Sequence, residues 1–392
     1  MEADTLNLEA LQSDGKHLIA ARCMVGPVQS LSGTKTPNST LENISFAPPG
    51  LSMLNIKDSR FTLLHTPTPL RRMMRLEGRI GRAPLYVKRD DHMEIGMGGN
   101  KLRSLEYWLG AALDEGADVV LVAGGPMSNQ CRLTAAAASV AGLDCVVFHN
   151  ANPHDESLRA SFLNGLFGAE VRFLGNVSEQ QRAVLVEEAA DELRRQGRSP
   201  YIVGDAIIGA LGYVQGALEL HRQSRSLDAP IRHVVLPGSM GPTEAGFIFG
   251  NALQDNPFEI HLVSVEYGQA DLAARIARIY CDLAAHTGLA APEFDNLLVH
   301  YHMDHLGPGY GHPTEASEKA IVTLARTEGI LLEHIYTAKT FAGFMDLVTS
   351  EAIPPDEPPC VIHTGGTASL FSQFHLFRAL EREAGMPIAV GA

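Results

Sequence analysis

Short apolar runs alternate with longer segments of helical periodicity from about residue 66 onward. Apolar runs flanked by helices indicate buried parallel strands joined in βαβ units. The runs predict strands at 84–90, 118–124, 144–150, 169–175, 199–204, 233–238, 260–267 and 360–365. The segments between them predict helices at 101–115, 128–141, 156–168, 178–195, 208–225, 243–253, 270–287, 314–328, 338–350 and 369–383. We therefore expect an α/β fold with open, mostly parallel sheets flanked by helices.

The beginning of the chain does not follow this pattern. Residues 1–45 are mixed in composition and become rich in Ser, Thr, Asn, Gly and Pro from Gly26 onward. They predict an N-terminal extension with a short helix near 6–23. The extension is either a packing or dimer arm or a disordered segment, and its sequence leaves this choice open.

Composition and charge narrow the class of protein. The chain has 392 residues, 45% hydrophobic and 19% charged, which is enough for one large or two medium domains. Its formal net charge of -14, without a Lys/Arg run, argues against nucleic acid and anionic membranes as partners. The five cysteines form no CxxC pair, which indicates a reducing compartment and no thiolate metal site. Because neither a membrane-spanning run nor a signal peptide is evident, we expect a cytoplasmic protein.

One lysine lies where a predicted strand leads through two glycines into a predicted helix, in the segment Gly98-Gly99-Asn100-Lys101. The glycines permit a tight turn, and the positive end of the helix disfavours the ammonium form of Lys101. A desolvated lysine in this position can act as an amine nucleophile. The ordinary alternative is a solvated surface lysine.

Further glycine-rich turns follow other predicted strands, at Gly124-Gly125, Gly238 and Gly365-Gly366. Open parallel sheets bind ligands at the carboxyl ends of their strands, where such turns lead into helices. The turns therefore predict a single ligand cleft that includes Lys101.

Two of these turns have the character of anion sites. Ser128, Asn129 and Gln130 open a predicted helix, where free backbone N–H groups and polar side chains can hold an anion. A Ser or Asn that only caps the helix is the alternative. The second turn has the strand, glycine loop and helix order of a phosphate cradle and contains Gly238, Ser239, Gly241 and Thr243. Its Pro242 has no N–H, so one phosphate donor is expected to be missing or shifted.

Residues 88–106 resemble the signature of pyridoxal-phosphate (PLP) enzymes of fold type II. They contain Lys-Arg-Asp-Asp followed by Gly-Gly-Asn-Lys-Leu-Arg-Ser-Leu-Glu. More narrowly, it resembles the family of 1-aminocyclopropane-1-carboxylate (ACC) deaminase and D-cysteine desulfhydrase. The resemblance extends over about residues 46–385. It implies a fold like that of the tryptophan synthase β-subunit and a PLP cofactor bound covalently to Lys101. It also implies a large PLP-binding domain at 46–103 and 213–392, a small domain at 104–212, and a homodimer by analogy.

The resemblance also implies roles for individual residues. Ser128, Asn129 and Gln130 are expected to hold the substrate carboxylate, and Asn129 to contact the ring oxygen of PLP. The phosphate is assigned to the Gly238–Thr243 turn, and the ring to Thr337, Thr364 and Gly365. Segments at 307–311 and 332–340 resemble the two tyrosine segments of the family, so Tyr310 and Tyr336 are expected to face the substrate and move a proton.

Thr337 bears on the reaction. Deaminases of the family have Glu at this position, which pairs with the pyridine nitrogen, whereas desulfhydrases have Thr. A carboxylate keeps the pyridine nitrogen protonated and strengthens the cofactor as an electron sink, whereas a hydroxyl does not. The weaker sink suits β-elimination, where a good leaving group removes the negative charge. We therefore expect D-cysteine desulfhydrase-like chemistry on a small amino acid: Lys101 removes the α-proton, the β-substituent leaves, and a 2-oxo acid and ammonia form.

Several alternatives stay open. ACC deaminase is supported by Gln130 and opposed by Thr337, and another β-lyase or a racemase for an unusual amino acid is a third choice. A nucleotide-binding oxidoreductase would show Gly-x-Gly-x-x-Gly after an early strand, which is not found. A catalytically silent binding protein is disfavoured because Lys101 is retained.

A histidine-rich segment at 300–305 could bind zinc through His300, His302 and His305. No fourth ligand is evident, and only two of the three histidines would share a face in an extended chain. We therefore expect no metal there, and instead a polar loop that leads into Tyr310 and shapes substrate choice.

Overall fold

The computed structural model describes residues 56–152 and 161–372, all of which belong to the compact unit that begins at Asn55. The predicted N-terminal extension lies outside these residues. No helix in the described ranges is both long and apolar enough to cross a membrane.

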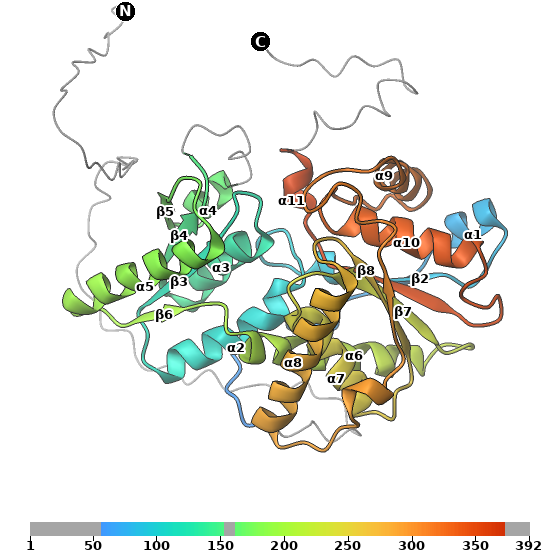
Figure 1. Cartoon of the computed structure of the whole chain (residues 1–392), viewed down its shortest axis with the longest axis horizontal. Coiled ribbons are helices and arrows are strands. Elements are labelled where there is room, and N and C mark those ends of the chain that lie inside the picture. Colours follow the sequence, from blue (N-terminus) through green and yellow to red (C-terminus); the bar gives the residue numbers. More distant parts are fainter. Residues whose placement is uncertain (1–55, 153–160, 373–392) are drawn as a thin grey trace, which may run out of the picture. The chain divides into compact units, whose positions relative to one another are not determined.

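A six-stranded sheet forms the larger of two sheets (Figure 1). Its strands, in spatial order, are β1 (Leu70–Arg72), β2 (Tyr86–Arg89), β10 (Pro359–His363), β7 (His233–Gly238), β8 (Glu259–Ser264) and β9 (Val299–His302). β1 is antiparallel to β2, and every other neighbouring pair is parallel. The carboxyl ends of five strands therefore meet at one edge of the sheet.

The smaller sheet has four parallel strands in the order β5 (Glu170–Phe173), β4 (Asp144–His149), β3 (Val119–Gly124) and β6 (Pro200–Ile202). All four come from the segment predicted as the small domain, while the strands of the larger sheet come from outside it. The exact boundaries of the two domains stay a prediction.

Helices cover both faces of the larger sheet. Val235 of β7 packs into a core shared with α1 (Met74–Ile80), α9 (Glu315–Glu328) and α10 (Thr337–Thr349). Val234 and Leu236 alternate with Val235 along the strand and are also fully buried, so the opposite face is covered too. α7 (Pro242–Ala252) packs against β7 and lies between α6 (Ala206–Ser224) and α8 (Gln269–Thr287).

The smaller sheet is covered in the same way. α2 (Lys101–Asp114) and α3 (Asn129–Ala141) share one core with its strands, whereas α5 (Glu179–Arg195) packs on the other face. α4 (Phe162–Leu166) contacts α3 and β5. α2 also packs on α6, so it joins the smaller sheet to the helices of the larger one.

The predicted α/β class and all eight predicted strands are confirmed. Among the strands and α-helices of the described residues, β1, α1 and β9 were not predicted, and neither were the short 3-10 helices Asp90–His92 and Phe294–Asn296. The predicted helices at 156–168 and 369–383 appear as α4 and as α11 (Thr367–Leu370), and parts of both predictions lie outside the described residues.

The expected polar loop at His300–His302 is wrong, because these residues form the edge strand β9. His300 pairs in register with His261 of β8, and their rings stack with centroids 4.7 Å apart. An edge strand has no strand beyond it, so it tolerates polar side chains that hide its strand character in the sequence.

Candidate active site

Two glycine turns that are far apart in the sequence meet at the carboxyl edge of the larger sheet. Gly99 and Gly365 form an isolated antiparallel bridge, and the N–H of Asn100 donates to the carbonyl of Thr364 over 2.9 Å. A Cβ on Gly365 would lie only 2.5 Å from the Cα of Gly99, and Gly365 has a φ of +97°. Only glycine allows this approach, which brings the turn after β10 against the start of α2.

Lys101 is the first residue of α2 and is half-buried. The neighbouring Asn100 amide donates to the hydroxyl of Thr243 over 3.0 Å, which ties this turn to the turn after β7. Burial lowers the pKa of Lys101, and the carboxylates of Glu244 and Glu266 oppose this shift. The amine is therefore more easily deprotonated than that of a surface lysine, as a nucleophile requires.

The charged residues around Lys101 in the signature form the support of this turn. Asp90 is buried and accepts two hydrogen bonds of 2.9 Å from Arg103. It also accepts one of 2.6 Å from the phenol of Tyr213. Burial alone would raise the pKa of Asp90, but Arg103 and Lys88 lower it well below its usual range. Because the backbone carbonyl of Asp90 accepts the N–H of Gly99, this ion pair anchors the lysine turn.

The turn after β7 already holds an anionic oxygen. The N–H of Ser239 donates to the carboxylate of the buried Glu244 over 2.5 Å, and the turn passes through Gly241 at a φ of +106°. Pro242 is the first residue of α7, where an N–H has no partner within the helix. The proline therefore does not disturb the helix, and the turn keeps its other donors.

The three residues expected at the substrate carboxylate lie together at the start of α3, and their side chains have different neighbours. Ser128 is the N-cap, and its hydroxyl accepts the N–H of Cys131 over 3.3 Å. Gln130 lies beside Gly204, just past the end of β6. Only Asn129 is aimed at the turn after β10, with its Nδ2 atom 3.2 Å from where a Cβ on Gly366 would lie.

The two expected tyrosines are in contact. Their phenol oxygens are 2.5 Å apart, and their rings meet edge to face with centroids 5.7 Å apart. Burial raises the pKa of Tyr310 to about 12, and burial also raises that of Tyr336. Both phenols are therefore protonated at neutral pH.

Two carboxylates that the sequence analysis did not single out belong to the same region. Glu266 follows β8, accepts the hydroxyl of Ser239 over 2.5 Å, and acts electrostatically on Lys101 and both tyrosines. Glu333 is buried, and a Cβ on Gly366 would lie 2.6 Å from its Cγ atom. No sequence signal marked Glu266, which lies within the strand predicted at 260–267; in the structure β8 ends at Ser264, two residues before it.

Glu333 is also bound to Thr337. Its carboxylate accepts the N–H of Thr337 over 2.8 Å, and the Thr337 hydroxyl lies 3.1 Å from the same oxygen. The hydroxyl that was expected to act alone at the pyridine ring is thus in contact with a carboxylate. Glu333 precedes the helix predicted at 338–350, so no regular spacing in the sequence pairs it with Thr337.

His363 fixes the turn after β10. Its Nδ1 atom accepts the N–H of Gly365 over 3.1 Å, and its Nε2 atom donates to the carbonyl of Leu331 over 2.8 Å. Burial lowers its pKa, which keeps the ring neutral and preserves this donor and acceptor pattern.

The three histidines considered as zinc ligands do not share one neighbour, since His300 and His302 contact His261 and His305 does not. His302 bonds to His261 over 3.1 Å, whereas His305 pairs with Asp346 over 3.0 Å. In the part of the chain that the structure describes, no three or more His, Cys, Asp or Glu residues have a metal-binding arrangement.

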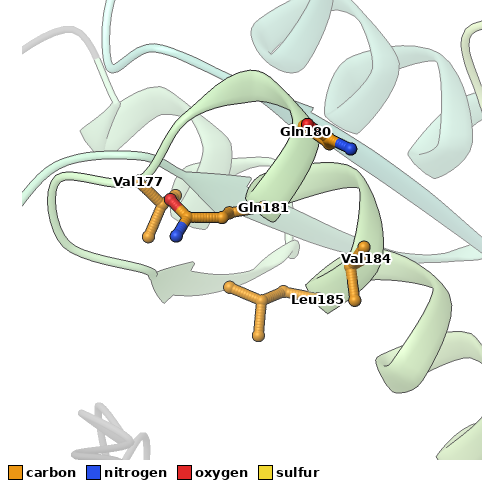
Figure 2. A pocket seen from close by; sticks show the side chains of 5 residues that line it. All are labelled: Val177, Gln180, Gln181, Val184 and Leu185. Carbon is orange, nitrogen blue, oxygen red and sulfur yellow. The ribbon is translucent and has the colours of Figure 1, made fainter.

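An open pocket of about 410 Å³ lies along α5 (Figure 2). It is lined by Val177, Gln180, Gln181, Val184 and Leu185. None of these side chains is titratable or nucleophilic, and none belongs to the glycine turns. The pocket is therefore separate from the candidate active site.

The fold and this site define the class of protein. Residues 61–365 match the family model described as pyridoxal-phosphate dependent enzyme, so the chain belongs to this family and has PLP fold type II. The family resemblance found in the sequence is confirmed, and so is the PLP cofactor that the resemblance implied.

The most informative relatives are D-cysteine desulfhydrases. The enzyme of Salmonella choleraesuis (strain SC-B67) is 35% identical to this chain, and that of Salmonella paratyphi B (strain ATCC BAA-1250 / SPB7) is 34% identical. Each match extends over 322 residues and covers 80% of this chain and 95% of the relative. Among solved structures, an ACC deaminase homologue matches with a TM-score of 0.75 at 29% identity, covering 83% of this chain and 98% of the other. A PLP-dependent aspartate racemase matches with a TM-score of 0.56 at 17% identity, which shows the shared fold alone.

The residues present fit PLP. Lys101 offers an amine of lowered pKa, and the turn after β7 offers N–H groups that already hold a carboxylate. Asn129 offers an amide aimed at the Gly365–Gly366 turn. The amine can bond covalently to the aldehyde of PLP, the N–H groups can donate to its phosphate, and the amide can donate to its ring oxygen.

Proposed function

We propose that the protein is a PLP-dependent lyase that removes the α-proton of a small amino acid and eliminates its β-substituent, with D-cysteine as the model substrate. One observation carries this proposal: the phenol oxygens of Tyr310 and Tyr336 lie 2.5 Å apart near the carboxylate of Glu266. Glu266 accepts the hydroxyl of Ser239 in the turn after β7 and also acts electrostatically on Lys101. A basic amine and a proton donor are thus available around one carboxylate. Elimination needs both, one at the α-carbon and one at the leaving group.

We assign the cofactor to residues of the three turns. Lys101 would hold it covalently, Gly238, Ser239, Gly241 and Thr243 would bind its phosphate, and Asn129, Thr337, Thr364 and Gly365 would contact its ring. Bound PLP supplies the electron sink for the charge left on the α-carbon. Burial raises the pKa of Glu244, which eases protonation of this carboxylate beside a phosphate.

The remaining steps belong to side chains of this chain. Ser128, Asn129 and Gln130 hold the substrate carboxylate, and the Lys101 amine takes the α-proton. The C–S bond of D-cysteine breaks, the sulfur leaves with the bonding electrons, and Tyr310 or Tyr336 gives it a proton. The unsaturated amine that remains takes up one water and yields pyruvate and ammonia.

ACC deaminase is the second candidate. Gln130 and the structural match to an ACC deaminase homologue favour it, and Thr337 opposes it. Glu333 weakens that opposition, because its carboxylate contacts the Thr337 hydroxyl. The products separate the candidates: D-cysteine yields sulfide and pyruvate, whereas ACC yields 2-oxobutanoate without sulfide.

A panel assay with the PLP-loaded protein tests both. Oxo acid, sulfide and ammonia are measured over D- and L-amino acids and ACC, and the visible absorption of the lysine-bound cofactor is recorded before and after borohydride. The Lys101→Ala variant is expected to lose the visible band and all turnover. A visible band that persists in this variant would overturn the assignment of Lys101, and a racemised product would favour an amino-acid racemase.

We also propose a cytoplasmic homodimer, with a small domain at 104–212 and a large domain formed by 46–103 and 213–392. The free thiols of the described cysteines Cys131, Cys145, Cys281 and Cys360 are compatible with a reducing compartment. Light scattering on the purified chain tests the dimer, and a monomeric mass at micromolar concentration would contradict it.

A further inference from the structure

Arg132 lies on α3, three residues after Asn129, and is only 4% exposed. Its Nη2 atom donates to the Oδ1 atom of Asn129 over 3.0 Å and to the carbonyl of Gly98 over 3.3 Å. Its Nη1 atom is buried and has no hydrogen-bond partner among the residues that the structure describes. The side chain therefore links α3 to the lysine turn and retains one unused donor.

The charge of Arg132 is uncompensated. Burial lowers its pKa to about 10, and among residues 56–152 and 161–372 no carboxylate acts against this shift. Arg103 is equally buried but is paired with Asp90 and Glu219. Burying a charge without a partner is costly, so an arginine kept in this state indicates an anionic or electron-rich group that belongs beside it.

The contact with Arg132 also decides how the Asn129 amide points. An arginine can only donate, so it holds the amide oxygen and turns the amide nitrogen away from itself. That nitrogen is the atom that lies 3.2 Å from the Cβ position of Gly366. A reversed amide would place two donors against each other and would present an acceptor to the turn after β10.

We propose that Arg132 is a positioning residue that locks Asn129 as a hydrogen-bond donor to the ring oxygen of the cofactor and, through its unpaired charge, keeps that oxygen ionised. This inference rests on the proposed cofactor site. The two effects act in the same direction, because a donated hydrogen bond and a nearby cation both stabilise an oxyanion.

The test measures the absorption spectrum of the lysine-bound cofactor at fixed pH. The form with an ionised ring oxygen absorbs in the visible, and the form with a protonated oxygen absorbs in the near ultraviolet. In Arg132→Met we expect the ratio of visible to near-ultraviolet absorption to fall about tenfold, the size expected for one charge-assisted hydrogen bond. Arg132→Lys keeps the charge and is expected to restore part of the ratio.

A double-mutant cycle with Asn129→Ala separates positioning from a general structural role. If Arg132 acts through Asn129, the double variant is expected to be little worse than the poorer single variant. If Arg132→Met cannot be purified folded, the cycle of Arg132→Lys with Asn129→Ala gives the same comparison. Arg198→Met is the control, because Arg198 is paired with Asp118 and Asp144 at the surface, and it should leave the spectrum unchanged.

An unchanged spectral ratio in Arg132→Met, or effects of Arg132 and Asn129 substitutions that simply add, would overturn the inference. If the wild-type protein takes up PLP and shows a visible band, and the Arg132 variants have the same spectrum, this inference alone is refuted. A wild-type protein that shows no such band refutes the proposed cofactor site, and this inference with it.

Discussion

The phenol oxygens of Tyr310 and Tyr336 lie 2.5 Å apart, although 26 positions separate the two residues in the chain. Tyr310 comes from the loop after β9, and Tyr336 directly precedes α10. In such a pair one phenol donates to the other, so the pair retains one proton that is free to be given away. The contact therefore makes the two tyrosines one proton-donating unit.

Removal of either hydroxyl should impair the chemical step. We expect Tyr310→Phe and Tyr336→Phe each to lower kcat by about 10²–10⁴-fold, the usual contribution of a positioned acid. Because the pair acts as one unit, the double variant should be scarcely slower than the poorer single variant. Steady-state kinetics checks this, with the spectrum of the bound cofactor as the control for an intact site. A single variant with wild-type kcat would show that the phenols do not donate the proton.

The pair also makes a prediction about pH. Since burial raises the pKa of Tyr310 to about 12, its phenol keeps its proton throughout the neutral and mildly alkaline range. Any loss of activity as the pH rises through that range must therefore come from the titration of another group. The pH at the midpoint of this loss should be the same in Tyr310→Phe as in the wild type. A midpoint that disappears in this variant would contradict the raised pKa.

Lys339 should control the position of Tyr310. Its ammonium donates to the carbonyls of Leu306 and Gly309 over 2.7 and 2.8 Å, so it ties the Tyr310 loop to α10. Lys339→Met should lower kcat while the cofactor spectrum stays unchanged, because the loop loses its anchor and the cofactor does not. It should also destabilise the fold by about 1.5–3 kcal/mol, the value of a hydrogen bond to a charged group.

Lys319→Met is the matched control for this change. Lys319 is exposed on α9 and is paired only with Glu315 in the described part of the chain, so its replacement should alter neither kcat nor melting temperature noticeably. If Lys339→Met behaves like this control, Lys339 does not anchor the loop.

The contact of the two glycine turns should not tolerate a methyl group. In Gly365→Ala the new Cβ would meet the Cα of Gly99 at 2.5 Å, and alanine is strained at a φ of +97°. We expect a loss of about 1–3 kcal/mol in stability and weaker retention of PLP, because the turns must move apart. Gly78→Ala is the control, since it lies in α1 with nothing within 4 Å of its Cβ position. Chemical denaturation and dialysis against cofactor-free buffer measure the two effects.

The Asp90–Arg103 ion pair should govern part of the acid stability. The pKa of Asp90 is lowered in the folded protein, so the unfolded state binds a proton at higher pH than the folded state does. The stabilisation is therefore complete above the pKa of an unfolded aspartate, 3.8, and is lost as the pH falls from there through the lower pKa of the folded protein. Asp90→Asn should cost about 3–5 kcal/mol at neutral pH, because it removes one of the two carboxylates that pair with the buried Arg103.

The pH dependence gives the control for this variant. Asp90→Asn should show a shallower loss of stability on acidification than the wild type, whereas the exposed Asp191→Asn should follow the wild-type curve. Parallel curves for Asp90→Asn and the wild type would contradict the proposed origin of the acid sensitivity.

The sequence by itself determined the layered α/β class, the parallel strands and the turn that presents Lys101. These follow from local information: an apolar run, a helical repeat and a glycine pair act on a few neighbouring residues. Where the local pattern was misleading, as in the histidine-rich β9, the prediction failed because pairing with β8, and not side-chain hydrophobicity, makes these residues a strand.

Only the tertiary structure decided which side chains meet. The contacts of Arg132 with Gly98, of Glu333 with the Gly366 turn and of Glu266 with Ser239 join residues far apart in the chain and do not follow from their spacing. Their contacts arise when strands and helices from distant parts of the sequence pack and bury polar groups that must then find partners. The identity of a candidate residue is thus encoded locally, whereas its hydrogen bonds, its pKa and the direction in which it points are set by the packing of the whole fold.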